Sequence, residues 1–150
     1  MNPDSYNFTV DKFTFTIPTD RLYSTDGLWV RQEGHHFWVG ISDYLQRRSG
    51  DIAFAEVKPE GSVVRGGDEL AAVETIKVTI SLPAPIPGKV IQVNPMMGSH
   101  PEIINENPYG EGWLVLMESL DEEPILESLL EPLAYYQKVK REAEQEAGKA

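Results

Sequence analysis

The chain reads Val73-Glu74-Thr75-Ile76-Lys77-Val78-Thr79-Ile80 near its centre, and in this run one lysine separates two groups of β-branched residues. β-Branched side chains suit a pleated, half-buried surface, so the run predicts two strands joined by a tight bend. Glycine, asparagine and aspartate, which usually mark a hairpin turn by adopting positive φ, do not occur at this bend. We therefore expect a turn of type I or a similar kind, with Lys77 exposed at its tip.

Lys77 admits two interpretations. An exposed lysine in a turn is most often only a solvated charge. A hairpin tip also presents an unhindered amine, however, which is what an amide-forming ligase needs. The residues next to Lys77 leave both interpretations open, and more distant motifs decide between them.

Further motifs accompany the lysine. Early in the chain they are Trp29-Val30-Arg31, Val39-Gly40-Ile41-Ser42-Asp43-Tyr44 and Gly50-Asp51-Ile52, and later comes Glu102-Ile103-Ile104-Asn105-Glu106-Asn107-Pro108-Tyr109-Gly110-Glu111-Gly112-Trp113-Leu114. Together they resemble the glycine cleavage H protein family, over residues 20–135. Glu74-Thr75-Ile76-Lys77 stands where that family carries its lipoylation motif, and Ala84-Pro85-Ile86-Pro87-Gly88 matches the motif that follows it.

The resemblance implies a lipoyl carrier. Lipoic acid would be attached as N6-lipoyl-lysine at Lys77, in an attachment loop made by Glu74, Thr75, Ile76 and Val78. The implied fold is mainly β, the barrel-sandwich hybrid of lipoyl and biotinyl domains, with short peripheral and C-terminal helices. Such a protein is a carrier within a multienzyme system and not an enzyme, so we expect no catalytic residues in it.

The residues expected to hold the loaded arm depart from the family pattern. Asp26, Leu28 and Ser81 stand where the family has a serine and a glutamate before the tryptophan of its WVR motif and an acidic residue after the lysine. An aminomethyl cation against leucine loses a charge-assisted hydrogen bond worth roughly 1.5–3 kcal/mol, which Asp26 replaces only in part. The departure favours an H-like lipoate-binding protein of sulfur oxidation over a true glycine cleavage H protein that shuttles an aminomethyl group.

The implied partners follow from these two hypotheses. A lipoate-protein ligase or lipoyl transferase would attach the cofactor, and dihydrolipoyl dehydrogenase would act on the arm. The arm would also visit the glycine cleavage enzymes or, in sulfur oxidation, a heterodisulfide-reductase-like (Hdr-like) complex. A third hypothesis is an unmodified H-like fold that serves as a binding module. Lys77→Ala separates it from the carriers, because a swinging-arm protein loses transfer activity with its lysine.

Composition excludes several other functions. The chain has 150 residues, a formal net charge of −11 and no cysteine. An acidic chain does not suit nucleic-acid binding, and without cysteine there is no disulfide, thiolate metal site or cysteine nucleophile. No run has the length of a membrane span and the N-terminus lacks signal-peptide features, so we expect a cytoplasmic location without membrane contact. His35 and His36 point to opposite faces of a strand, so we expect no metal site.

We expect three parts along the chain. Residues 1–19 form an N-terminal extension with an edge strand, residues 20–135 the H-protein-like lipoyl domain, and residues 136–150 a charged C-terminal helix or tail that frays. Residues 122–146 have a helical pattern in which Pro132 marks a break between two helices.

Two smaller features complete the expectations. Ser42–Gly50 predicts a short helix with a serine or aspartate cap and a glycine stop. The carboxylates of Glu102, Glu106 and Glu111 lie in a segment rich in Asn, Pro and Gly, where such groups normally satisfy the loop's own backbone rather than act as acid or base.

Overall fold

The computed structural model describes residues 4–121 and 126–148, and this part of the chain is mainly β, as expected. Its strands are β1 (Ser5–Val10), β2 (Phe13–Pro18), β3 (Leu22–Tyr23), β4 (Leu28–Glu33), β5 (His36–Ile41), β6 (Ile52–Val57), β7 (Val63–Val64), β8 (Glu69–Thr75), β9 (Thr79–Pro83), β10 (Gly88–Val93) and β11 (Val115–Glu118). Its helices are α1 (Asp43–Ser49), α2 (Met96–Ser99), α3 (Ile103–Glu106) and α4 (Pro132–Ala147).

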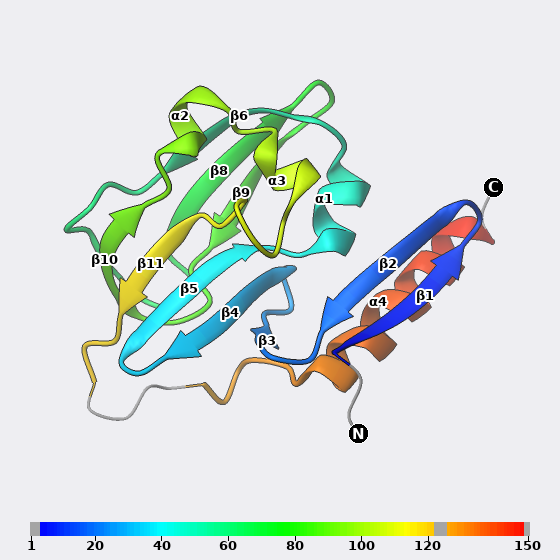
Figure 1. Cartoon of the computed structure of the whole chain (residues 1–150), viewed down its shortest axis with the longest axis horizontal. Helices are drawn as coiled ribbons and strands as arrows, with labels where there is room; N and C mark the ends of the chain where they lie inside the picture. The colour runs from blue at the N-terminus through cyan, green and yellow to red at the C-terminus, as the bar shows by residue number, and fades with distance from the viewer. Residues whose placement is uncertain (1–3, 122–125, 149–150) are drawn as a thin grey trace.

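Two antiparallel sheets share the main core. One has the strand order β3-β4-β5-β11-β10-β7 and the other β6-β8-β9 (Figure 1). Alternate residues of each strand face inward, and the core joins buried side chains of the first sheet, such as Phe37 and Met117, to those of the second, such as Leu70, Val73 and Leu82. Two sheets around one core, with short helices at the edges, make up the expected barrel-sandwich hybrid.

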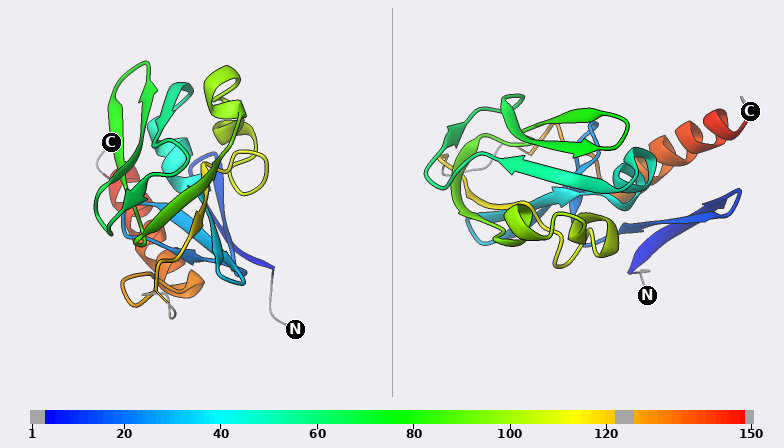
Figure 2. Two further views of the ribbon diagram at one scale, coloured as in Figure 1. Left: turned by 90° about the vertical axis from the view of Figure 1, so that its left-hand side faces the viewer. Right: turned by 90° about the horizontal axis from the view of Figure 1, so that it is seen from above.

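The N-terminal extension contains a strand where the sequence predicts an edge strand, β2, and this strand has a partner, β1, that was not predicted. β1 and β2 form a complete antiparallel hairpin, with Ser5 opposite Pro18 and Val10 opposite Phe13. The hairpin does not join either large sheet, and it lies against α4 at one end of the molecule (Figure 2). Aromatic side chains make this contact, because the Phe8 ring packs edge-on against Tyr136 with centroids 5.7 Å apart.

The C-terminal helix corrects two expectations. Pro132 begins α4 instead of breaking a helix, since the first turn of a helix does not need the N–H that proline lacks. The helix continues to Ala147 and does not fray from Lys138, because Tyr135, Val139 and Ala143 recur at a spacing of four and are all buried. A boundary at residue 135 would cut this helix. Residues 122–125, where the helical pattern was expected to start, lie outside the described residues.

The short helix expected near residue 45 is confirmed. α1 begins after Ser42, whose side chain accepts a hydrogen bond from the Leu45 amide, and it ends at Gly50, whose φ of 89° only glycine adopts easily. Among the helices in the described ranges, none has the length and apolar character required to cross a membrane.

Candidate functional site

The β8–β9 hairpin carries Lys77 at its tip. Glu74 pairs with Thr79 and Val73 with Ile80, so the two strands stay in register up to the turn. The turn is closed by a hydrogen bond from the Thr75 amide to the Val78 carbonyl, at 2.8 Å. The two residues between them, Ile76 and Lys77, therefore form the exposed end of the hairpin.

The Thr75 side chain stabilises this turn, which contains no glycine or asparagine. Its Oγ1 accepts hydrogen bonds from the backbone amides of Lys77 and Val78, both at 3.2 Å, and donates to the Val78 carbonyl at 3.3 Å. Neither Ile76 nor Lys77 has positive φ. A threonine hydroxyl thus stabilises a bend that has no left-handed residue, which agrees with the type I-like turn that the sequence predicts.

Lys77 is free at this tip. Its side chain is exposed, and within the described residues its ammonium makes neither a hydrogen bond nor an ion pair. Ile76 is 97% exposed and Val78 is 50% exposed, while Glu74 is exposed on the strand below. The amine is therefore accessible from several directions, which is the condition for its modification by another enzyme.

The core fixes the hairpin from below. Leu70, Ala71 and Val73 of β8 and Leu82 of β9 are at most 3% exposed and belong to the main core. The inward residues of the hairpin thus anchor both strands to the rest of the domain, and only the turn projects. Lys77 consequently stands at a fixed place on the molecule although its own side chain is unrestrained.

The three residues expected to line an arm cleft have different environments. Asp26 is exposed in the turn between β3 and β4, and Ser81 is exposed on β9. Leu28 is fully buried in the main core, at 0% exposure, so its side chain offers no surface to a carried group. The expected cleft is corrected at this position, because Leu28 faces the domain interior along with its pairing partner Ile41.

The segment that follows β10 contains structural contacts that sequence reasoning did not identify. Tyr109 donates its hydroxyl proton to the Thr16 carbonyl at 2.7 Å and accepts the Asp43 amide at 3.0 Å, so it joins the N-terminal hairpin to α1. Burial raises the pKa of Tyr109 well above the ordinary value of 10.0, and this keeps its hydroxyl a donor. The sequence feature that could have indicated this role is a tyrosine placed between Asn107-Pro108 and Gly110, in a segment that otherwise has the composition of a loop.

A cation completes the contact around Tyr109. The Arg21 guanidinium lies over the Trp29 ring at 4.6 Å and over the Tyr109 ring at 5.2 Å. It also donates to Asp20 at 2.8 Å, and this hydrogen bond holds the pKa of the Asp20 carboxyl below its ordinary value of 3.8. Arg21 therefore connects the residues just before β3 to the motif at residues 102–114, where it also donates to the Tyr109 carbonyl at 3.1 Å.

The carboxylates of this segment differ partly from expectation. Glu102 and Glu106 both pair with His100, at 2.6 and 3.3 Å, rather than with the loop's backbone. The backbone is instead satisfied by asparagines: Asn94 donates to the carbonyls of Glu111 and Trp113. In the ranges 4–121 and 126–148 no cluster of histidine and acidic side chains has the arrangement of a metal site.

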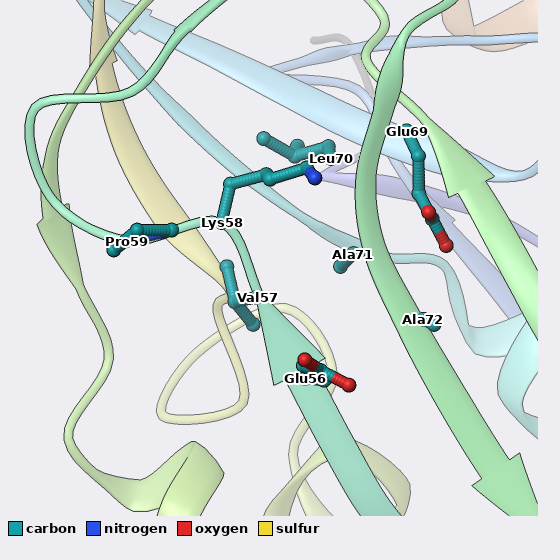
Figure 3. A pocket seen from close by; sticks show the side chains of 8 residues that line it. All are labelled: Glu56, Val57, Lys58, Pro59, Glu69, Leu70, Ala71 and Ala72. Atoms are coloured by element: carbon teal, nitrogen blue, oxygen red, sulfur yellow. The ribbon is translucent and has the colours of Figure 1, made fainter.

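A hollow of about 200 Å³ lies between the end of β6 and the start of β8 (Figure 3). Lys58, Pro59, Glu69 and Leu70 line it, and the Lys58 amide donates to the Leu70 carbonyl at 2.9 Å. These residues are at the opposite end of β6 and β8 from the attachment turn, where Ile52 pairs with Thr75. The hollow is thus remote from Lys77 and forms no part of its site.

Comparison with known proteins agrees with this geometry. The family model described as Glycine cleavage H-protein matches residues 21–142. A glycine cleavage system H protein of Carboxydothermus hydrogenoformans is 36% identical over 128 residues, which cover 85% of this chain and 98% of the relative. One of Rubrobacter xylanophilus is 39% identical over 126 residues, covering 84% and 97%.

A solved structure extends the likeness to three dimensions. The crystal structure of a glycine cleavage system H protein from Mycobacterium marinum superposes with a TM-score of 0.73 at 29% identity, covering 81% of this chain and 98% of that one. The residues matched by the family model, 21–142, include the β8–β9 hairpin, both large sheets and most of α4, and they begin after the β1–β2 hairpin. The chain therefore belongs to the glycine cleavage H-protein family.

Proposed function

We propose that this protein is the lipoyl carrier of a glycine cleavage system and that it presents a lipoyl group on Lys77 to partner enzymes. The observation that carries the proposal is Lys77 itself, an exposed amine at the tip of a hairpin anchored in the core. Membership of the family supports the cofactor, and the names of the relatives support glycine cleavage. When attached, a lipoyl group supplies two sulfur atoms at the end of a flexible chain.

Lys77 acts as an acyl acceptor in the attachment step. Its Nζ, after losing the ammonium proton, attacks the carbonyl carbon of an activated lipoyl donor held by a lipoate-protein ligase or lipoyl transferase. An amide C–N bond forms, the bond to the leaving group breaks, and a second proton leaves the nitrogen. In this step Lys77 is the substrate and the ligase or transferase supplies the catalytic groups, and membership of the family supports a carrier role.

The carried group is the finer question. A preference for sulfur oxidation depended on a leucine facing the loaded arm, but the buried Leu28 side chain does not reach the surface, so that argument does not apply. The relatives named above are glycine cleavage system H proteins, and they give the Hdr-like complex no support. An aminomethyl group is therefore the proposed cargo, exchanged with glycine decarboxylase and aminomethyltransferase, and dihydrolipoyl dehydrogenase reoxidises the arm.

The charge of the chain supports transient docking. A net charge of −11 attracts basic faces of partner enzymes and raises the encounter rate at low ionic strength. Acylation removes the Lys77 charge and makes the attachment tip more acidic. We expect the association rate with a partner enzyme to fall as salt is added, and an association rate independent of salt would argue against this steering.

The test is the intact mass and peptide map of the protein isolated from its host, with thiols alkylated before any reductant is added. We expect a lipoyl adduct on Lys77 and an aminomethyl group on part of the arms. Lys77→Arg should lose the adduct, while Lys58→Arg, which changes another exposed lysine, should keep it. An unmodified Lys77 would refute the carrier function, and a sulfur-containing adduct would replace glycine cleavage by sulfur oxidation.

A further inference from the structure

Large apolar side chains are exposed beside the attachment lysine. Phe54 of β6 is 67% exposed, and Ile76 and Val78, which flank Lys77, are 97% and 50% exposed. Single exposed apolar side chains are common on protein surfaces, whereas several large ones close together usually indicate an interaction surface. Here such a group coincides with the proposed modification site.

The register shows why Phe54 faces outward. Phe54 pairs with Glu74, and Glu74 pairs with Thr79, so these residues form one row across the three-stranded sheet. The next row, Ala55 with Val73 and Ile80, faces the core. Because successive residues of a strand alternate between faces, the Phe54 row lies on the open side, and its member Glu74 directly precedes the Thr75–Val78 turn that carries Lys77.

Phe54 has no evident structural task. Its ring makes no aromatic contact in the described residues, whereas Phe13, which is 48% exposed, lies beneath the Arg47 guanidinium at 5.1 Å. It does not belong to either buried cluster. A phenylalanine that contributes nothing to the core is free to serve a partner.

The surroundings of Phe54 are acidic. Glu74 is its neighbour across the sheet, and Glu56, two residues further along β6, is also exposed. Within the described ranges neither carboxylate takes part in an ion pair. A complementary surface would therefore combine an apolar hollow for the ring with a rim of lysine or arginine side chains.

The modifying enzyme must distinguish Lys77 from the other exposed lysines, and this surface offers a means of doing so. Lys12, Lys58 and Lys89 are also exposed, so accessibility of the amine does not identify Lys77. Lys89 lies in a row with the exposed Val63, but it lies within strand β10 rather than on a projecting turn, and neither of its cross-strand partners is aromatic. What sets Lys77 apart is a projecting turn above an exposed phenylalanine with free carboxylates.

We propose that Phe54, with Glu56 and Glu74, is the surface by which the enzyme that acylates Lys77 recognises the folded hairpin. The inference rests on the proposed function, since it presupposes that Lys77 is the acylated residue. Phe54 acts through recognition and touches neither Nζ nor the acyl donor. The partner is a ligase or transferase with an apolar hollow bordered by basic side chains.

The experiment measures acylation of the unmodified full-length protein by a lipoate-protein ligase with lipoate and ATP, followed by intact mass. Phe54→Ala should lower kcat/KM for the carrier protein by about tenfold or more, chiefly through KM, as expected for removal of a central anchor. Val63→Ala, which truncates a similarly exposed side chain on β7, should stay within about twofold. Glu56→Lys should also raise KM. Circular dichroism and urea unfolding establish that each variant is folded.

A binding measurement separates recognition from chemistry. Lys77→Gln cannot be acylated, and calorimetry should show that Phe54→Ala in this background weakens binding to the ligase by about the same factor as KM rises. Equal acylation of Phe54→Ala and Val63→Ala would overturn the proposal, even if Phe54→Ala later failed to pass its cargo to other enzymes. Failure of the ligase to modify wild-type Lys77 would instead refute the proposed function itself.

Discussion

Replacing Thr75 with valine removes the hydroxyl that closes the attachment turn but keeps the shape of the side chain. The change eliminates two accepted hydrogen bonds of 3.2 Å, from the amides of Lys77 and Val78, and one donated bond of 3.3 Å. A net intramolecular hydrogen bond stabilises a protein by about 0.5–1.5 kcal/mol. Because these bonds are long and water can solvate an exposed tip, we expect a total loss of about 1–2 kcal/mol.

The assay is equilibrium urea unfolding of the unmodified protein. A loss of this size raises the unfolded-to-folded ratio by about 5–30-fold, which is well resolved as a shift of the midpoint at constant m-value. Hydrogen exchange at the Lys77 and Val78 amides should be faster in Thr75→Val than in the wild type. The exchange rates of amides elsewhere in the sheet should change less. Acylation of Lys77 should slow as well, because the loosened turn no longer presents the amine in one arrangement.

Two variants control for this experiment. Thr75→Ser retains the hydroxyl and should recover most of the lost stability. Thr79→Val makes the same chemical change at an exposed position of β9 whose side chain has no hydrogen bond in the described residues. If Thr75→Val were as stable as Thr79→Val and exchanged its turn amides no faster, the hydroxyl would not be what stabilises the turn.

Three further perturbations follow from the structure. Tyr109→Phe removes a hydroxyl that both donates and accepts, and urea unfolding should show a loss of about 1–3 kcal/mol. Gly40→Ala would place a methyl 2.5 Å from the Trp29 indole, which is 1% exposed, so a destabilisation of about 1–3 kcal/mol is expected with altered tryptophan fluorescence. Asp20→Asn should reduce stability at neutral pH, since the hydrogen bond from Arg21 lowers the pKa of Asp20; that contribution is present above the unfolded pKa of 3.8 and disappears as pH falls through the lower folded value.

A control variant or a pH series tests each of these three predictions. Tyr136→Phe, which removes a hydroxyl without a hydrogen bond in the described residues, should leave stability nearly unchanged. Gly98→Ala should be tolerated, because no atom lies within 4 Å of the added methyl. A stability difference between Asp20→Asn and the wild type that did not shrink as the pH was lowered below the unfolded pKa of 3.8 would contradict the role given to the Asp20 carboxylate.

Local features were predictable because they depend on neighbouring residues. The two strands around Lys77 follow from β-branched side chains, and α1 follows from Ser42 and Gly50. The Thr75 turn was predictable in kind but not in detail. Its geometry was inferred from missing glycine and asparagine, whereas the hydroxyl that stabilises it could have been inferred from the known ability of threonine to bond its own following amides.

The predictions that failed concerned features that depend on contacts between residues far apart in sequence. Leu28 was assigned to a cleft from its position beside Trp29, but which face of β4 lines the core depends on pairing with β5. Pro132 was interpreted as a break, and its role as a first helical residue became evident only where α4 begins. The edge strand expected at the N-terminus is β2, but its pairing with β1 was not predicted, because the hairpin packs against α4, more than a hundred residues later.

The sequence by itself determined the family, the mainly β fold and the position of Lys77 at a hairpin tip, because motifs of consecutive residues encode strands and turns. Only the tertiary structure decided what surrounds that lysine. Phe54 lies 23 residues before Lys77 in sequence, and it comes close to the Lys77 turn because β6 pairs with β8 in a register that turns its ring outward. Strand pairing and burial arise from contacts between distant segments, and those contacts give a single exposed side chain its functional meaning.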